Sequence, residues 1–271
     1  MSTVVEALPG TPLPHGILSG CFDVQEIPDS RLHELLGIEW LSLGCCPTQV
    51  WHDPCATDPP GAPVEKTFCR PTVERADPIH VYAGAECSTI GWSYAEARRE
   101  ALLSLELGQQ RAIEEGFWRD TLAPNAVDLT PAEGPVPLVQ GVAALEGALA
   151  ETYGGRGVLH VPAGAAALLG CCQVAHREGD CLETLAGNQV TISAGASALN
   201  TGPDGLPAEP GSAWLAITGP VQVRLGPIGV VPDRAGASVD YRFNDLRVLV
   251  ERSALVRMTC QPYMVRVTLC P

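Results

Sequence analysis

The sequence predicts an α+β fold built around one long helix that lies across a sheet. Three observations lead to this prediction: a proline-free helical run at 93–120, a middle section in which helical and strand-like runs alternate, and a tail with strand-like runs only. The chain has 271 residues, of which 46% are hydrophobic, and this is enough for one large domain or two small ones.

The helix is expected at 93–120, SYAEARREALLSLELGQQRAIEEGFWRD. Ser93 and Glu96 have the spacing of a capping box, and good helix formers follow them. A narrow apolar stripe consists of Leu102, Leu105, Ala112, Ile113 and Phe117. The polar residues expected largely on the other faces are Glu100, Gln110, Arg111 and Glu114. At 1.5 Å per residue the helix would be about 42 Å long, so we expect a strut whose other faces meet water or neighbouring chains.

Ahead of the helix the sequence has little regular pattern. Four prolines and scattered glycines in residues 1–30 predict an extended arm that other surfaces must order. A short helix or turn is expected at 31–43, and a long irregular excursion at 46–63. Two strand-like runs follow at 64–70 and 78–83, with 71–77 as their connection.

After the helix, a Pro- and Ala-rich linker at 122–137 leads into an α/β subdomain at roughly 136–220. Its first helix, 138–153, is indicated by Leu138, Val142, Leu145 and Leu149 at helical spacing, and Gly154-Gly155 ends it. The other expected elements are a strand at 157–161, an apolar helix at 163–176, two short strands within 182–193 that turn at Gly187-Asn188, a turn at 202–205 and a strand at 213–218.

The last stretch is expected to be β, with strands at 221–225, 229–231, 246–251, 255–260 and 263–269. In the final strand, Val265, Val267 and Leu269 alternate with polar residues, so one face should be buried and the other wet. The long helix is the natural partner for the buried face. That pairing would make the second subdomain discontinuous in sequence.

The charge of the chain limits its partners. The formal net charge is −14 and Lys66 is the only lysine, which argues against nucleic acid as the main partner because phosphate binding needs clustered positive charge. The longest apolar run, 163–175, is too short to span a bilayer. The N-terminus lacks a basic region before an apolar core, so no signal peptide is visible and folding in a cytoplasm is expected.

Eleven cysteines are many for a cytoplasmic protein. None has the Cys-x-x-Cys spacing, which excludes a zinc ribbon and a thioredoxin-like motif. Cys45-Cys46 and Cys171-Cys172 are adjacent pairs, and adjacency disfavours a bridge within each pair. Two interpretations stay open: the cysteines are buried thiols, or some of them pair across subunits after exposure to an oxidising environment.

Motifs of common catalytic sites are missing from the sequence. There is no G-x-S-x-G, H-E-x-x-H or G-x-G-x-x-G motif, and the single lysine does not follow a glycine as a P-loop requires. Cys172 and His176 are at i and i+4 on the expected helix 163–176, where they could support a thiolate nucleophile or two metal ligands. Because that helix is apolar, packing is the favoured role, and we expect no catalytic residue and no enzyme activity.

The remaining candidate ligands have ordinary structural explanations. Cys46, His52 and Cys55 could begin a zinc site, but they lack the usual Cys-x-x-Cys spacing. His80 and His160 each lie inside an expected strand and are interpreted as structural histidines with satisfied hydrogen bonds. No metal and no cofactor are therefore expected.

The order of parts resembles the HK97-like fold of tailed-phage major capsid proteins. A Pro-rich arm, an extended loop, a long spine helix, an inserted α/β domain and a β-rich tail coincide. The tail, LRVLVERSALVRMTCQPYMVRVTL, is similar to the terminal strands of the family. The segments ARREALLSLELGQQRAIEEGFWRD, HVPAGAAALL, LAGNQVTISAG and AWLAITGPVQVRLGPIGVVPD are similar to segments of capsid proteins from phages of actinobacteria. The resemblance covers 64–271.

The resemblance implies a division of the chain into an N-terminal arm (1–39), an extended loop with the first peripheral strands (40–83), a peripheral domain with spine helix 93–120 (84–135), an axial domain (136–220) and closing peripheral strands (221–271). It implies identical subunits that form hexamers and pentamers of an icosahedral virion shell around double-stranded DNA, assembled in the host cytoplasm. Scaffold, portal and decoration proteins are the further partners it implies; sequence-specific nucleic-acid binding and membrane binding are not expected.

Some members of the family cross-link a lysine of the extended loop to an asparagine in the peripheral domain of a neighbour. Lys66 and Asn244 lie in about the corresponding elements, although an ordinary surface lysine is the favoured interpretation. Two alternatives to a phage head stay open. One is an encapsulin-like nanocompartment shell that encloses a cargo enzyme. The other is a cysteine-dependent hydrolase that uses Cys172 and His176 and exists as a monomer or small oligomer.

Overall fold

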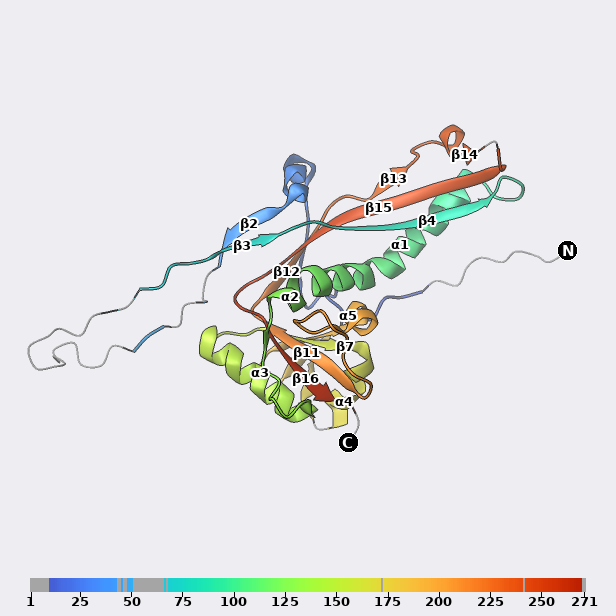
Figure 1. Ribbon diagram of the computed structural model, residues 1–271. Helices are drawn as coiled ribbons and strands as arrows, with labels where there is room; N and C mark the ends of the chain where they lie inside the picture. Colours follow the sequence, from blue (N-terminus) through green and yellow to red (C-terminus); the bar gives the residue numbers. More distant parts are fainter. Residues whose placement is uncertain are drawn as a thin grey trace, which may run out of the picture.

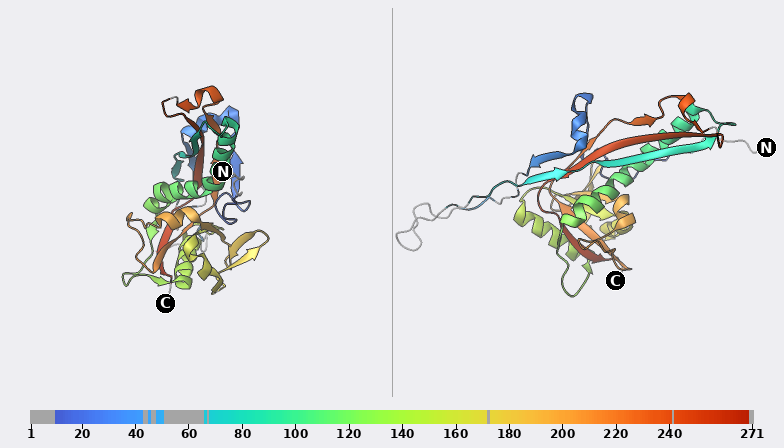
Figure 2. Two further views of the ribbon diagram at one scale, coloured as in Figure 1. Left: turned by 90° about the vertical axis from the view of Figure 1, so that its right-hand side faces the viewer. Right: turned by 45° about the horizontal axis from the view of Figure 1, so that its top comes forward.

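The structure is a computed structural model that describes residues 10–42, 45, 48–50, 66, 68–171, 173–240 and 242–269. Within these ranges it contains two large β-sheets, and a long helix, α1 (Tyr94–Phe117), lies against the first of them (Figure 1). A separate ribbon of β2 (Ile38–Leu41) and β3 (Val73–Ala76) projects from the end opposite the start of α1 (Figure 2). The predicted α+β class is confirmed.

The first sheet is organised around the long strand β15 (Asp245–Met258). Over the described residues it has six strands in the order β1-β12-β15-β13, with β14 and β4 also paired to β15. The other strands are β1 (Asp23–Glu26), β4 (Ile79–Ser88), β12 (Val221–Leu225), β13 (Gly229–Val231) and β14 (Val239–Asp240). The expected break between 246–251 and 255–260 is not found, because β4 pairs with the first part of β15 and β12 with the last part.

Helix α1 begins as the sequence predicts. The Ser93 hydroxyl accepts from the Glu96 amide at 3.3 Å, and the Glu96 carboxylate accepts from the Ser93 amide at 2.7 Å, so the capping box is confirmed. The helical path runs past the expected end at 120, through a π-helical turn (Trp118–Leu122) and α2 (Ala123–Asn125). Leu105, Ile113 and Phe117 of the apolar stripe are buried against the sheet.

The second sheet has eight strands over the described residues, in the order β5-β16-β11-β7-β10-β9-β8, with β6 also paired to β16. The strands are β5 (Val127–Asp128), β6 (Val136–Pro137), β7 (Val158–Pro162), β8 (Ala175–Glu178), β9 (Cys181–Thr184), β10 (Gln189–Ser193), β11 (Ser212–Thr218) and β16 (Tyr263–Thr268). The expected hairpin at Gly187-Asn188 is confirmed by β9 and β10. The stretch 122–137 is not merely a linker, since β5 and β6 pair with β16.

The last strand belongs to the second sheet and not to the sheet under α1. β16 pairs antiparallel with β11, and its valines Val265 and Val267 pack in the same core as α3 (Leu138–Thr152). The expectation that 263–269 buries its apolar face on the long helix is therefore wrong. Strands of both sheets carry the same alternating pattern, so the pattern does not distinguish between two available apolar faces.

Helix α3 confirms the prediction for 138–153, because Leu138, Val142, Leu145 and Leu149 are all buried. The apolar helix expected at 163–176 is much shorter. A 3-10 turn (Ala163–Ala165) and α4 (Ala166–Cys171) are followed by Gln173, whose φ of 53° is left-handed, and the chain then enters β8. Helix α5 (Ala194–Leu199) follows β10 and packs against α1.

The connection expected at 71–77 contains strand β3, which pairs with β2, so that prediction is wrong. The strand expected at 64–70 falls partly outside the described residues, and the described positions 66 and 68–70 are not in a strand. The excursion at 46–63 lies outside the described residues except for 48–50. The turn at 202–205 is confirmed by the hydrogen bond from the Gly205 amide to the Gly202 carbonyl at 3.0 Å.

Helix α3 offers a paired test of the packing against β16. A Cβ on Gly141 would lie 2.4 Å from Val267 Cγ1 and 3.1 Å from Val265 Cγ1, and both valines are buried and stiff at χ1. We expect Gly141→Ala to lower the free energy of unfolding by about 1–3 kcal/mol. Gly147→Ala, on the same helix with no atom within 4 Å of the new Cβ, should raise it by about 0.5–1 kcal/mol. Urea unfolding followed by circular dichroism measures both; effects of the same sign would contradict this packing.

Candidate functional site

Over the side chains that the structure describes, no metal-binding cluster is formed, and the candidate residues of the sequence are not brought together. Over those residues, no group of three or more His, Cys, Asp or Glu side chains could hold a metal ion. His176 lies in β8, exposed and paired with Glu183, so the helical i, i+4 pairing with Cys172 is wrong. Cys172 itself lies outside the described residues. The same is true of Cys46, His52 and Cys55, so a zinc site there stays a prediction.

The two strand histidines are hydrogen-bonded, as predicted. His80 Nδ1 lies 2.8 Å from the Ser253 hydroxyl, and His160 Nε2 lies 3.1 Å from the Thr218 hydroxyl. His160 is buried next to the Phe117 ring, with the ring centroids 5.8 Å apart. Burial lowers the pKa of His160 from 6.5 to about 3 because the imidazolium would lose its water. His160 is therefore a neutral structural residue.

The N-terminal segment 10–36, here called the strap, packs on its own chain. Ile17, Phe22 and Ile27 are buried, and β1 pairs in parallel with β12 of the first sheet. The extended arm expected at 1–30 is therefore wrong for residues 10–30. The reason is that the apolar residues of the strap lack a regular spacing, so the sequence shows no buried face, although the fold buries them in its hydrophobic cores.

The Glu114 carboxylate of α1 accepts hydrogen bonds from both the strap and the start of α5. Its Oε1 accepts from the Ile17 amide at 3.0 Å, and its Oε2 accepts from the Ala194 and Gly195 amides at 2.9 and 3.2 Å. The Ser193 hydroxyl donates to Oε2 at 3.1 Å and also caps α5. Burial raises the pKa of the Glu114 carboxyl, while these four hydrogen bonds oppose the rise.

Close backbone approach explains why glycines surround this carboxylate. A Cβ on Gly16 would lie 2.0 Å from Gln110 Nε2, and a Cβ on Gly195 would lie 2.3 Å from the Glu115 amide nitrogen. Gln110 Nε2 donates to the Leu13 carbonyl at 3.0 Å. Gln110 and Glu114 were expected away from the packed side of α1, and both are buried. Gln110 lies three residues before Ile113, and Glu114 lies three residues before Phe117. This helical spacing is the signal that could have placed both on the buried face.

Two arginines of the first sheet, Arg252 and Arg224, hold the second half of the strap. Arg252, which is 8% exposed, donates to the Gly226 carbonyl at 2.6 Å and to the Glu26 carboxylate at 2.5 Å. Arg224 forms an ion pair with Glu34, which is also buried. Glu26 is 71% exposed, so its pair with Arg252 is open to water on one side, whereas both members of the Arg224–Glu34 pair are largely shielded. Together the two pairs join the strap to β12 and β15.

Two disulfides join parts that are distant in sequence. Cys21–Cys181 links the strap to β9, across 160 residues. Cys45–Cys260 links the segment that follows the ribbon strand β2 to the turn between β15 and β16, across 215 residues. Both earlier interpretations, buried thiols and pairing between subunits, are wrong for these four cysteines. Their partners lie on the same chain, and nothing in the spacing of the cysteines indicates which residues the fold brings together.

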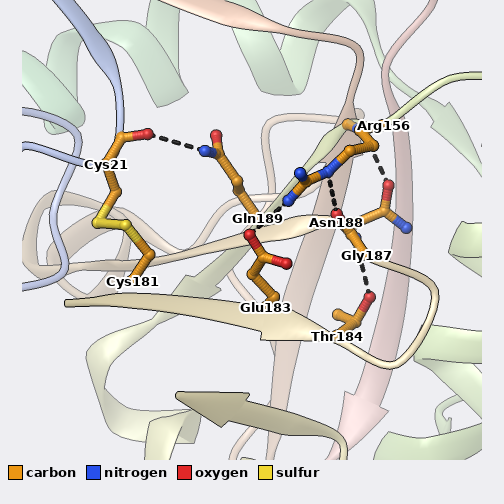
Figure 3. Close-up of polar contacts among 9 residues, drawn as sticks. Cys21, Arg156, Cys181, Glu183, Thr184, Gly187, Asn188 and Gln189 are labelled. Carbon is orange, nitrogen blue, oxygen red and sulfur yellow. Dashed lines mark hydrogen bonds and ion pairs between the residues drawn. A yellow bond between two sulfur atoms is a disulfide. The ribbon is translucent and has the colours of Figure 1, made fainter. Parts of the chain in front are cut away.

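The region around Cys181 is ordered by side-chain hydrogen bonds (Figure 3). Gln189 Nε2 donates to the Cys21 carbonyl at 2.8 Å, beside the disulfide. Arg156 Nε donates to the Gly187 carbonyl at 2.6 Å, and its guanidinium forms an ion pair with Glu183. Asn188 Oδ1 accepts from the Gly157 amide at 2.8 Å. The β9–β10 hairpin is thus held to β7, and the strap is held to the hairpin.

Large apolar side chains are exposed at both ends of the molecule. Leu41 and Val73, opposite each other in the ribbon, are 60% and 64% exposed, and Phe68 is 91% exposed. At the other end, Ile90 and Phe243 are 81% and 66% exposed. Exposed apolar side chains in groups mark surfaces that other proteins cover. They make the ribbon and the far turn the candidate interaction surfaces of the chain.

The cross-link predicted between Lys66 and Asn244 of a neighbour stays a prediction. Lys66 is exposed. Asn244 has a left-handed φ of 57°, and its Oδ1 accepts from the Thr89 hydroxyl at 2.6 Å, which joins the β14–β15 turn to the turn before α1. Asn244 therefore has a structural role within its own chain.

Comparison with solved structures identifies the fold. No protein-family model and no curated protein matches the chain. A chain from Mycobacterium phage Bobi is 14% identical, with 98% of this chain and 94% of that chain covered and a TM-score of 0.51. A chain of the capsid of a native GTA particle is 13% identical, with 99% and 95% covered and a TM-score of 0.51. The chain has the HK97-like capsid fold.

The HK97-like fold confirms the resemblance seen in the sequence. A chain from Mycobacterium phage Cain, 13% identical with a TM-score of 0.50 and with 98% of this chain and 95% of that chain covered, agrees with it. At such identities the likeness establishes the fold, and function has to be argued from surfaces. Among the residues that the structure describes, no helix is both long enough and apolar enough to cross a membrane.

Proposed function

We propose that the chain is the shell subunit of an icosahedral phage head, in which hexamers and pentamers of identical subunits enclose double-stranded DNA. The observation that carries this proposal is the match along nearly the whole length of both chains to the capsid of a GTA particle. The exposed apolar residues of the ribbon support it, because a solitary subunit would leave them in water. Such a subunit has a mechanical role and needs no catalytic residue.

Within this proposal the second sheet with α3 is the axial domain, and the first sheet with α1 is the peripheral domain. The axial domain predicted at 136–220 then gains two strands, because β16 pairs with β11 and β5, which lies before residue 136, pairs with β16. The peripheral domain correspondingly loses 263–269 from its predicted closing strands at 221–271. The β2–β3 ribbon is the base of the extended loop, and it reaches toward a neighbouring subunit.

The charge of the subunit suits a container for DNA. A net charge of −14 leaves little attraction for phosphates, so packaged DNA would not adhere to the inner wall. The proposed shell is built in the host cytoplasm and remains as the virion capsid. Scaffold, portal and decoration proteins are further proposed partners. The encapsulin-like alternative stays a prediction, and the contents of the assembled particles distinguish it from a phage head.

Assembly of the purified chain tests the proposal. We expect particles of megadalton mass, or rings of five or six subunits, in gel filtration and negative-stain microscopy. Leu41→Asp with Val73→Asp should leave the subunit folded but stop assembly, since the two exposed side chains share one face of the ribbon. Leu41→Met keeps the apolar surface and is the matched control.

A wild-type chain that stays a compact monomer at all protein concentrations would overturn the proposal. Assembly of the double aspartate variant at the wild-type level would remove the ribbon from the interface. Particles that contain nucleic acid fit a phage head. The ratio of their ultraviolet absorbance at the nucleic-acid maximum to that at the protein maximum detects the nucleic acid. Particles that contain a second protein and no nucleic acid fit a nanocompartment.

A further inference from the structure

One disulfide connects the two sheets of the subunit, and the other connects the ribbon segment to the turn between the sheets. The strap pairs through β1 with the first sheet, and Cys21–Cys181 attaches it to β9 of the second sheet. Cys260 lies in the turn that leads from β15 of the first sheet to β16 of the second, and Cys45 follows the ribbon. The first bridge therefore limits how the strap and the second sheet move relative to one another, and the second bridge limits how the ribbon moves relative to the β15–β16 turn.

Hydrogen bonds next to each disulfide hold the two linked segments together even when the sulfur–sulfur bond is absent. On one side of Cys21 the Ile17 amide binds Glu114, and on the other the Ile27 amide donates to the Leu225 carbonyl at 2.7 Å. At the second bridge, the Cys260 amide donates to the Ser42 hydroxyl at 3.3 Å. The reduced chain can thus reach the same fold, with the four thiols already paired in space.

We propose that the two bridges are a redox lock that closes after folding: the strap and the base of the ribbon are held by hydrogen bonds while the thiols are reduced, and covalently once oxidised. The oxidant is a small disulfide such as oxidised glutathione. A Cys21 or Cys181 thiolate attacks it and releases one glutathione thiol; the second cysteine then displaces the other glutathione thiol. Two electrons pass to glutathione and one bridge forms, and the Cys45–Cys260 pair reacts in the same way.

The lock gives the proposed shell a later, more rigid state, and in this respect the inference rests on the proposed function. A reducing cytoplasm keeps thiols unpaired, and an oxidising medium outside the cell allows bridges to persist. Subunits would therefore assemble while the strap and ribbon base still adjust, and the shell would stiffen after release. Cys21, Cys45 and Cys181 are partly exposed, so a small disulfide reaches one cysteine of each pair.

Hydrogen exchange of the purified chain, reduced by a phosphine or oxidised by glutathione disulfide, tests the lock. We expect amides of 23–27 to exchange roughly tenfold faster in the reduced chain, because cross-links over such long loops remove opened states of the strap. The interior of β15 and α1 should exchange alike in both states. Alkylation and mass mapping should find the Cys21–Cys181 and Cys45–Cys260 pairs in the oxidised chain only.

Variants separate the lock from other effects. The double variant Cys21→Ser with Cys181→Ser should show fast exchange at 23–27 under oxidant as well, and Cys45→Ser should remove the second bridge only. Cys87→Ser is the matched control, because Cys87 is free within the described part of the chain. Cys69 is also disulfide-bonded, so its peptide is mapped separately.

Three results would overturn the lock: equal exchange at 23–27 in both redox states, mapping of these cysteines to other partners, or unfolding of both sheets on reduction. Because exchange is measured on the unassembled chain, it is independent of the proposed function. A chain that never forms particles but shows the redox-dependent exchange contradicts the shell and keeps the lock. Particles that form with redox-independent exchange contradict the lock alone.

Discussion

Replacing Glu114 by alanine is expected to lower the free energy of unfolding by about 3–5 kcal/mol. Four donors converge on this carboxylate: the amides of Ile17, Ala194 and Gly195, and the Ser193 hydroxyl. The alanine variant leaves these four buried donors without an acceptor. Each unsatisfied donor costs about 1–3 kcal/mol before the surrounding structure adjusts. Urea unfolding at neutral pH measures the loss.

The neighbouring residue provides the control for this prediction. Glu115 forms only a partly exposed i, i+4 ion pair with Arg111, so Glu115→Ala should cost about 0.5 kcal/mol or less. Hydrogen exchange should show where the damage falls: the Glu114→Ala variant should expose amides of the strap and of α5 before those of β15. Equal losses for the two variants would show that the converging donors contribute little.

The titration of Glu114 adds a pH dependence of known sign. Burial raises its pKa in the folded chain above the ordinary 4.5, so the folded chain holds the proton at a pH where the unfolded chain has lost it. The stability linked to that proton is complete below pH 4.5 and is lost as the pH rises through the folded pKa. Glu114→Gln cannot titrate, so the stability difference between wild type and this variant should change in that direction. A difference independent of pH would contradict it.

Acidification below pH 6.5 is expected to cost about 1.4 kcal/mol of folding stability per pH unit through His160 alone. The unfolded chain takes up a proton at the ordinary pKa of 6.5, whereas burial lowers the folded pKa to about 3. The stability linked to the neutral ring is therefore complete above pH 6.5 and is lost as the pH falls toward 3. Over this window the loss reaches about 5 kcal/mol, a large share of the stability of a typical domain.

His160→Gln isolates this contribution, since glutamine can keep the hydrogen bond to the Thr218 hydroxyl and does not titrate. Chemical unfolding at several pH values between 7 and 4 should give a shallower acid slope for this variant than for wild type. His80→Gln is the matched control, because His80 is exposed on a strand and bonded to a hydroxyl in a similar way. An unchanged slope in His160→Gln would mean that the ring is already protonated or hydrated in the fold.

Glu114 and His160 act in opposite directions between pH 4.5 and the raised pKa of Glu114 in the folded chain. As the pH falls through this range, protonation of Glu114 favours the folded chain. Over the same range the unfolded chain protonates His160 while the folded chain keeps it neutral, and this favours the unfolded chain. The wild-type profile therefore mixes two slopes. The two glutamine variants separate them, and the double variant should be the flattest of the three.

The sequence determined the elements whose signals are local. The capping box at Ser93 and Glu96, the apolar spacing of α3 and the turn at Gly187-Asn188 each depend on residues only a few positions apart, and the structure confirms all three. The resemblance to capsid proteins likewise used the order of such elements along the chain, and the HK97-like fold follows it. Local hydrogen bonding and side-chain period are enough for predictions of this kind.

Tertiary structure alone decided which distant surfaces meet. It placed β16 beside β11, laid residues 10–36 across both sheets, buried Glu114 under four donors and paired cysteines 160 and 215 residues apart. An alternating strand fits any apolar face of suitable width. The sequence around a cysteine or a carboxylate does not indicate which distant residue it will pair with. These choices depend on the packing of the whole chain, because burial and contact between distant residues arise only when the elements come together.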